Sequence, residues 1–235
     1  ETRDFLNRKE KSIQTMMTHL IVDLDGTLYE QKSVVIAYLK EFSKLLNLNF
    51  EQTERCYRKA YNQVKKTKKR HPNIKAFFSA VNKLFLPLIG LSPREEYLTL
   101  LEDLAEESKK EILLNITPRK GVKELLVYAK KKGLKIIVFT GSHEIHANVS
   151  AEKSDFSETL AFKKKQIEIL GLKKCIDEII PASLFGGYKP QRKVFEKLLK
   201  HLGCFGESCV IVGNSEYDMA GQDVGMSTIL IGNKE

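Results

Sequence analysis

The stretch HLIVDLDGTLYE, residues 19–30, decides the fold. Its apolar start, His19–Val22, has the pattern of a short buried strand. Asp23 and Asp25 follow at once, and burying unpaired charges in a core is costly. Gly26 lets the chain turn sharply where the strand ends. Ligands of open α/β sheets bind at the carboxyl ends of strands, so we expect a functional site here rather than an ordinary acidic turn.

The composition indicates a folded protein without a membrane part. The chain has 235 residues, of which 42% are hydrophobic and 29% are charged, enough for a sizeable core in one or two domains. No apolar run approaches the roughly 18 residues that a membrane span needs. The first 16 residues are charged, lack the apolar core of a secretion signal, and are expected to be an N-terminal extension.

The cysteine pattern favours reduced thiols in the cytoplasm. The four cysteines are Cys56, Cys175, Cys204 and Cys209, and none forms a CxxC pair. No cluster of histidines accompanies them in the sequence, so neither a zinc site nor a disulfide framework is expected.

A long helical block follows the first strand. Helices are expected over residues 33–47, 51–69, 74–86 and 93–114, from apolar residues at helical spacing. Ser33 and Ser92 are expected N-caps, with Pro93 in a first turn. We expect residues 31–115 to form an all-helical cap inserted into another domain.

The rest of the chain alternates between helix and strand. Strands are expected over residues 134–139, 176–180, 208–212 and 227–231, and helices over 118–132, 158–170, 190–202 and 217–224. This rhythm predicts an α/β fold, a Rossmann-like doubly wound parallel sheet core with an inserted all-helical cap domain. The core would comprise residues 17–30 and 116–235.

Polar side chains gather at the strand ends of this predicted sheet. They are Asp23, Asp25, Thr140, Ser142, Lys189, Asn214 and Asp218. Carboxylate and amide oxygens suit Mg²⁺, and a lysine with hydroxyls suits phosphate oxygens. A carboxylate can also attack phosphorus directly. The set therefore favours metal-assisted phosphoryl chemistry.

These motifs resemble those of the haloacid dehalogenase (HAD) superfamily, which is mostly phosphohydrolases. The matching segments, in the family's order, are DLDGT at 23–27, VFTGS at 138–142, GYKP at 187–190 with Phe195 downstream, and VGNSEYD at 212–218. The helical block resembles the family's C1 cap. The resemblance covers residues 17–231.

The resemblance implies specific roles for the two aspartates of the first motif. Asp23 would be the nucleophile that becomes phosphorylated, and Asp25 the general acid and base. Dehalogenases of the family lack this acid and base, so Asp25 favours phosphoester chemistry over carbon–halogen cleavage.

The resemblance also implies a phosphate site and a magnesium site. Thr140, Gly141 and Lys189 would bind the transferring phosphoryl group. Mg²⁺ would be held by Asp23, by the backbone carbonyl of Asp25, and by Asn214 and Asp218.

Two features depart from the family pattern. Asn214 stands where the family usually has Asp, which removes one negative charge and predicts weaker Mg²⁺ affinity. The stretch between Gly141 and Glu158 is longer than usual and holds His143 and His146. We expect these histidines to pack in a surface loop, with a substrate contact as the alternative.

The expected function is a cytoplasmic, Mg²⁺-dependent phosphohydrolase that removes phosphate from a small phosphorylated metabolite through an aspartyl-phosphate. A phosphomutase with the same nucleophile is one alternative, and a catalytically weakened HAD-fold binding protein is another. Residues 31–90 carry 13 Lys and Arg against three Asp and Glu. The basic run Lys65–Arg70 is expected to be a solvated face that attracts anionic substrate, and nucleic-acid binding is not expected.

Overall fold

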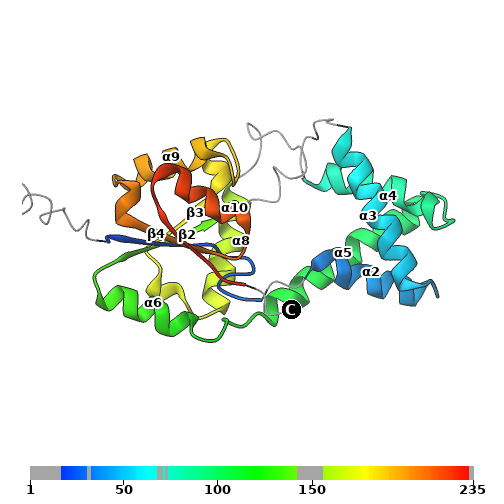
Figure 1. Cartoon of the computed structure of the whole chain (residues 1–235). Helices are drawn as coiled ribbons and strands as arrows, with labels where there is room; N and C mark the ends of the chain where they lie inside the picture. The colour runs from blue at the N-terminus through cyan, green and yellow to red at the C-terminus, as the bar shows by residue number, and fades with distance from the viewer. Residues whose placement is uncertain (1–16, 31–32, 68–70, 72–73, 142–155, 233–235) are drawn as a thin grey trace, which may run out of the picture.

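The computed structural model describes residues 17–30, 33–67, 71, 74–141 and 156–232. The expected N-terminal extension and both histidines of the 143–157 stretch lie outside these residues. A sheet flanked by helices forms one part of the molecule and a bundle of helices forms the other (Figure 1).

Five parallel strands form the sheet, in the order β3-β2-β1-β4-β5. The predicted doubly wound parallel α/β class is confirmed, and each observed strand lies within two residues of its predicted range. The strands are β1 His19–Val22, β2 Lys135–Thr140, β3 Glu178–Pro181, β4 Cys209–Gly213 and β5 Ser227–Leu230.

The central strand β1 is buried on both faces because it packs against helices on each side. Leu20 and Val22 belong to an apolar cluster with α6 Val122–Lys131 and α8 Phe156–Ile169. Ile21 belongs to the opposite cluster, with α9 Arg192–Leu202. Alternate strand residues point to opposite faces, so one continuous apolar run serves both layers.

The register places the end of β1 near the ends of its two neighbouring strands. Val22 pairs with Val138 of β2 on one side and with Val212 of β4 on the other. The chain winds from β1 outward through β2 to β3 and then returns to β4 beside β1. Ligands of open α/β sheets bind at such a reversal, and Asp23 and Asn214 follow the carboxyl ends of β1 and β4.

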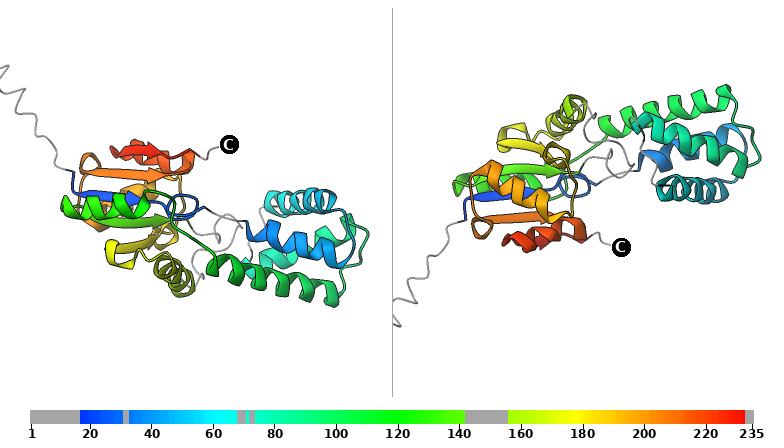
Figure 2. Two further views of the ribbon diagram at one scale, coloured as in Figure 1. Left: turned by 90° about the horizontal axis from the view of Figure 1, so that it is seen from below. Right: turned by 90° about the horizontal axis from the view of Figure 1, so that it is seen from above.

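Four helices form the second part of the molecule. They are α2 Val34–Leu45, α3 Phe50–Lys66, α4 Ile74–Leu88 and α5 Glu95–Leu114. They enclose a separate apolar cluster that includes the fully buried Phe42, Phe77 and Phe85. Helix α5 also contacts α8 of the sheet layer, as the two views of Figure 2 make visible. The division at residues 30 and 116 remains a prediction about domains.

Helix ends were predicted correctly where a side chain or a glycine sets them. The Ser33 hydroxyl accepts a hydrogen bond from the backbone N–H of Ile36 and caps α2. Gly133 and Gly203, which follow α6 and α9, have positive φ values of 78° and 65°, a conformation that glycine adopts without a steric penalty.

Three helix starts were predicted too early. Helix α5 begins at Glu95 with Arg94 as N-cap, so Ser92 is not the cap and Pro93 is not in the first turn. Glu95 and Glu96 provide the negative charge that favours a helix start. Helices α6 and α9 begin at Val122 and Arg192, after N-caps Gly121 and Gln191.

The last predicted helix is divided in two. It consists of α10 Glu216–Met219 and the 3₁₀ helix η4 Ala220–Val224. Three further 3₁₀ turns were not predicted: η1 Lys173–Cys175, η2 Ala182–Phe185 and η3 Gly206–Ser208.

The described part of the basic run lies at the C-terminal end of α3. Lys65 and Lys66 lie in the last turn of this helix and are exposed. Tyr57 is buried in the cluster of the four helices, and Tyr61 packs against it, as predicted. Residues 68–70 of the run lie outside the described residues.

The structure brings His19 next to Cys204 and Cys209, a contact that was not predicted from the sequence. Their nitrogen and sulfur atoms lie within 4.8 Å of one another, and the two sulfurs are 3.4 Å apart. Burial, reinforced by the Cys204 contact, raises the pKa of Cys209 to about 12. The thiol form therefore prevails at neutral pH, whereas the thiolate is the form that binds metals. All four cysteines are free thiols.

A search of the described helices finds none with the length and apolarity to cross a bilayer.

Gly206 provides a test of the packing between η3 and the end of η4. A Cβ at Gly206 would lie 2.0 Å from the Val224 carbonyl oxygen, whereas a Cβ at Gly232 would have no neighbour within 4 Å. Gly206→Ala should lower the free energy of unfolding by about 1–3 kcal/mol because backbone atoms must move. Urea denaturation of both alanine variants measures this. Equal midpoints would contradict the packing described.

Candidate active site

The centre of the site is a buried cluster of one ammonium and two carboxylates. Lys189 Nζ donates to Asp23 Oδ1 at 2.6 Å, to Asp218 Oδ1 at 2.6 Å and to the Phe139 carbonyl at 3.1 Å. The side chains of Asp23, Lys189 and Asp218 are only 8%, 7% and 1% exposed. With both carboxylates ionised, the cluster carries a net negative charge and attracts a further cation.

Burial and pairing act in opposite directions on the ionisation of this cluster. Burial raises the pKa of Asp23 and nearby Asp218 adds to the rise, while Lys189 opposes it. For Lys189, burial lowers the pKa, but the two carboxylates outweigh it and the net pKa is raised. Lys189 is therefore a permanent cation at physiological pH.

Thr27 links Asp23 to the end of β4. Its hydroxyl lies 3.2 Å from Asp23 Oδ2 and 3.3 Å from Asn214 Oδ1, two acceptors for a single proton. Gly26, with a φ of 80°, allows the approach, because a Cβ there would lie 2.2 Å from Asn214 Nδ2. Only glycine satisfies both the backbone conformation and this contact.

Asp218 is fixed by the first turn of α10. The backbone N–H and the hydroxyl of Ser215 donate to Asp218 Oδ2, at 3.4 and 3.0 Å. Gly213 leaves room for this carboxylate, because a Cβ there would come within 2.2 Å of it. One oxygen of Asp218 thus closes a capping box while the other faces Lys189.

Asp25 lies in a second polar network, separate from Lys189. Its Oδ2 accepts from Lys163 Nζ at 2.5 Å and from the Thr140 hydroxyl at 3.3 Å. Its Oδ1 accepts from the Tyr29 hydroxyl, which in turn accepts from Gln166 Nε2 at 2.8 Å. The carboxylate is therefore held at both oxygens.

The structure brings the predicted site residues together. Asp23, Lys189 and Asp218 form one cluster, Thr27 connects it to Asn214, and Thr140 connects the end of β2 to Asp25. Gly141 follows Thr140 directly and is half-buried. Ser142 lies outside the described residues. The roles assigned to these residues remain a prediction.

The partners of Asp25 were not predicted from the sequence. Lys163 and Gln166 come from α8, and Tyr29 from the turn after β1. A signal was present for Lys163, since it falls at helical spacing in an apolar stripe with Leu160 and Ile167 of α8 and Leu170 just after this helix. A lysine in such a stripe needs a buried anionic partner.

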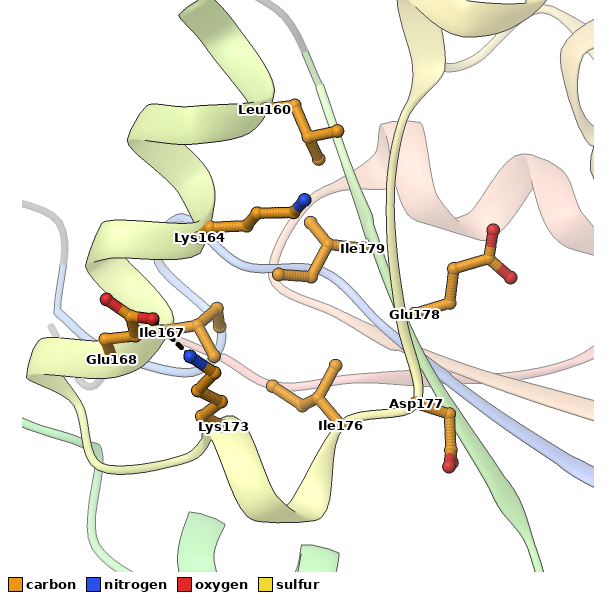
Figure 3. Close-up of a pocket in the computed structure, with 9 residues that line it drawn as sticks. All are labelled: Leu160, Lys164, Ile167, Glu168, Lys173, Ile176, Asp177, Glu178 and Ile179. Carbon is orange, nitrogen blue, oxygen red and sulfur yellow. Dashed lines mark hydrogen bonds and ion pairs between the residues drawn. The ribbon is translucent and has the colours of Figure 1, made fainter. Parts of the chain in front are cut away.

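A groove between a helix and the sheet edge lies away from this site. This groove of about 500 Å³ separates α8 from the edge strand β3 (Figure 3). Ile176 and Ile179 line it together with Lys164 and the ion pair between Lys173 and Glu168. None of the predicted site residues lines this groove.

A much smaller cavity, of about 60 Å³, borders Asp25. Helix α5 contributes Ile112 and Leu113 to its wall, next to Lys163 of α8. The α2–α5 bundle therefore closes one side of the Asp25 network.

Comparison with known proteins identifies the family. A family model described as haloacid dehalogenase-like hydrolase matches residues 17–221. A glyceraldehyde 3-phosphate phosphatase of Methanothermobacter thermautotrophicus is 34% identical over 67 residues, which is 28% of this chain and 30% of that relative.

Three solved structures show the same fold at low sequence identity. A haloacid dehalogenase-like hydrolase of Xanthomonas campestris superposes with a TM-score of 0.63 at 14% identity, covering 93% of this chain and 83% of the other. A predicted phosphoglycolate phosphatase of Haemophilus somnus gives 0.55 at 16%, covering 93% and 86%. An L-2-haloacid dehalogenase of Xanthobacter autotrophicus gives 0.55 at 15%, covering 92% and 78%.

The family model spans strands β1 to β4 with their strand-end residues and the inserted helices, and the chain therefore belongs to the haloacid dehalogenase-like hydrolases.

Proposed function

We propose that this protein is a Mg²⁺-dependent phosphatase that removes phosphate from a small phosphorylated metabolite through an aspartyl-phosphate on Asp23. The observation that carries the proposal is the buried Asp23–Lys189–Asp218 cluster, with Asp25 two residues away in a different network. The phosphatase from Methanothermobacter supports the reaction class for a limited part of the chain.

The first half of the reaction uses the two aspartates in different roles. A carboxylate oxygen of Asp23 attacks phosphorus, and the bond from phosphorus to the leaving oxygen breaks. Asp25, in its protonated form, gives its proton to that oxygen, so the product leaves as an alcohol. Lys189 balances the negative charge that the phosphoryl oxygens carry during transfer.

The second half releases phosphate. Asp25, now a carboxylate, takes a proton from a water molecule as the water oxygen attacks phosphorus. The bond from phosphorus to Asp23 then breaks, which regenerates the free carboxylate. Thr140 and Gly141, at the end of β2, would hold the phosphoryl oxygens in both steps.

The donor set suits a magnesium ion. Asp23 and Asp218 converge on the Lys189 ammonium, so these two carboxylates gather around a cation. Asn214 adds a carboxamide oxygen at the neighbouring strand end, and the Asp25 backbone carbonyl completes the proposed set. When bound, Mg²⁺ would neutralise phosphate charge and orient the substrate.

Asp25 separates phosphoester from carbon–halogen chemistry. A halide leaves as a stable anion and needs no proton, whereas an alkoxide is strongly basic and does. An acid beside the nucleophile is therefore useful for a phosphomonoester and superfluous for a haloacid.

Removing the nucleophile tests the proposal. Asp23→Asn should lower phosphate release by about 10³-fold or more on the substrates that a screen of phosphorylated metabolites with Mg²⁺ identifies. Asp223→Asn, an exposed aspartate, is the matched control. Equal rates for Asp23→Asn and wild type would show that Asp23 is not the nucleophile, and the absence of phosphate release from every compound in the screen would favour a binding protein. An isomeric phosphate ester as product would identify a mutase.

Lys189→Met should lower the free energy of unfolding by about 3–5 kcal/mol, because two buried carboxylates lose their shared partner. The loss should shrink on acidification. Burial raises the pKa of Asp23 and Lys189 opposes that rise, so the folded variant, which lacks Lys189, takes up a proton at higher pH than folded wild type and regains stability as the pH falls. Urea denaturation at several pH values measures this, with exposed Lys193→Met as control. A loss below about 1 kcal/mol would contradict the pairing.

Asn214→Asp should strengthen Mg²⁺ binding, by about tenfold, since a carboxylate attracts a divalent cation more strongly than a carboxamide does. Titration calorimetry with Mg²⁺ measures the affinity, and the magnesium dependence of phosphate release gives a second value. Exposed Asn115→Asp controls for a general change in charge. Unchanged or weaker binding would remove Asn214 from the metal site.

A further inference from the structure

Lys163 is buried on the inner face of α8, where an ammonium is costly without a partner. Its side chain is only 3% exposed, and its Nζ lies 2.5 Å from Asp25 Oδ2. Ile167 of α8 and Leu170, directly after this helix, belong to the apolar core. Lys163 thus offers its charge to Asp25 from within the core, beyond the reach of bulk solvent.

The other oxygen of Asp25 is fixed by a chain of buried groups. Tyr29 donates to Oδ1 and accepts from Gln166, which lies one helical turn after Lys163. Burial raises the pKa of Tyr29 well above its ordinary value, so its phenol remains a donor at any working pH. The donors therefore approach both oxygens of the carboxylate and restrict its rotation.

We propose that Lys163 is a positioning residue that, together with Tyr29 and Gln166, holds the Asp25 carboxyl group in the orientation from which it exchanges a proton with the leaving oxygen and the attacking water. The inference rests on the proposed phosphatase function and extends it to residues of α8. None of the four sequence motifs includes Lys163 or Gln166.

Residues of the helical bundle form part of the surroundings of Lys163 and Asp25. The small cavity at Asp25 is walled by Lys163 and by Ile112, Leu113 and Ile116 from the end of α5 and the segment after it. Apolar side chains keep the local polarity low, which strengthens the attraction between Lys163 and Asp25. The bundle thereby contacts the same network that holds the proton donor.

The role of Lys163 predicts a dependence on the leaving group. A strongly basic alkoxide leaves phosphorus only when Asp25 protonates it. In contrast, 4-nitrophenolate is a weak base and leaves readily without a proton. Loss of Lys163 should therefore slow the cleavage of an alkyl phosphate far more than that of 4-nitrophenyl phosphate. A merely structural role would lower both rates by the same factor.

The experiment compares Lys163→Met, Lys163→Arg and wild type on the two kinds of ester. For Lys163→Met we expect kcat to fall about 10–100-fold on an alkyl phosphate and less than about threefold on 4-nitrophenyl phosphate, with KM little changed. Lys163→Arg, which keeps the charge, should recover part of the alkyl phosphate rate. Exposed Lys165→Met is the matched control.

Equal losses on both esters, or no loss on either, would overturn the inference and leave the phosphatase function intact. Activity that survives Asp23→Asn would instead overturn the proposed function itself. If Lys163→Met does not fold, Tyr29→Phe takes its place, since it removes the donor to Asp25 Oδ1 and leaves Lys163 in position. Tyr29→Phe should show the same selective loss on alkyl phosphates, and a uniform loss would count against the network.

Discussion

The Lys189 ammonium between Asp23 and Asp218 is the interaction on which the site depends. Each of these charges alone would be costly to bury, yet all three side chains are almost fully enclosed. The cluster joins groups that are 195 residues apart in the chain, from Asp23 to Asp218. Any element that shifts a strand end would therefore disturb the charge balance of the whole site.

The parallel sheet makes this convergence possible. Strands β1, β2 and β4 end within two residues of one another in register, and the order of the strands reverses beside β1. Glycine then allows the loops to approach closely, since Gly26 faces Asn214 and Gly213 faces Asp218 without room for a Cβ. The backbone geometry at the strand ends and the charges of the side chains therefore bring the site residues together in the same small region.

Two aspartates separated by one residue lie in different environments. Asp23 faces Lys189 and the end of β4, while Asp25 faces Lys163 and Tyr29 under α8. Acid–base chemistry beside a nucleophile requires such a difference, because two carboxyl groups in the same surroundings would compete for the same proton. Each aspartate has its own lysine, and the two lysines come from different parts of the chain.

The sequence by itself determined the parallel α/β core, the helical insertion and the strand-end residues. The reason is local: short apolar runs followed by Asp, Thr or Asn turns have few alternative structures. Helix starts were less predictable, because Pro118 and Pro190 fit extended segments before a helix as well as a first turn. Only the tertiary structure decided which lysine pairs with which aspartate. It alone also placed His19 beside two cysteines. Contacts of this kind join residues distant in the sequence, and their energies depend on burial and distance, which no local pattern encodes.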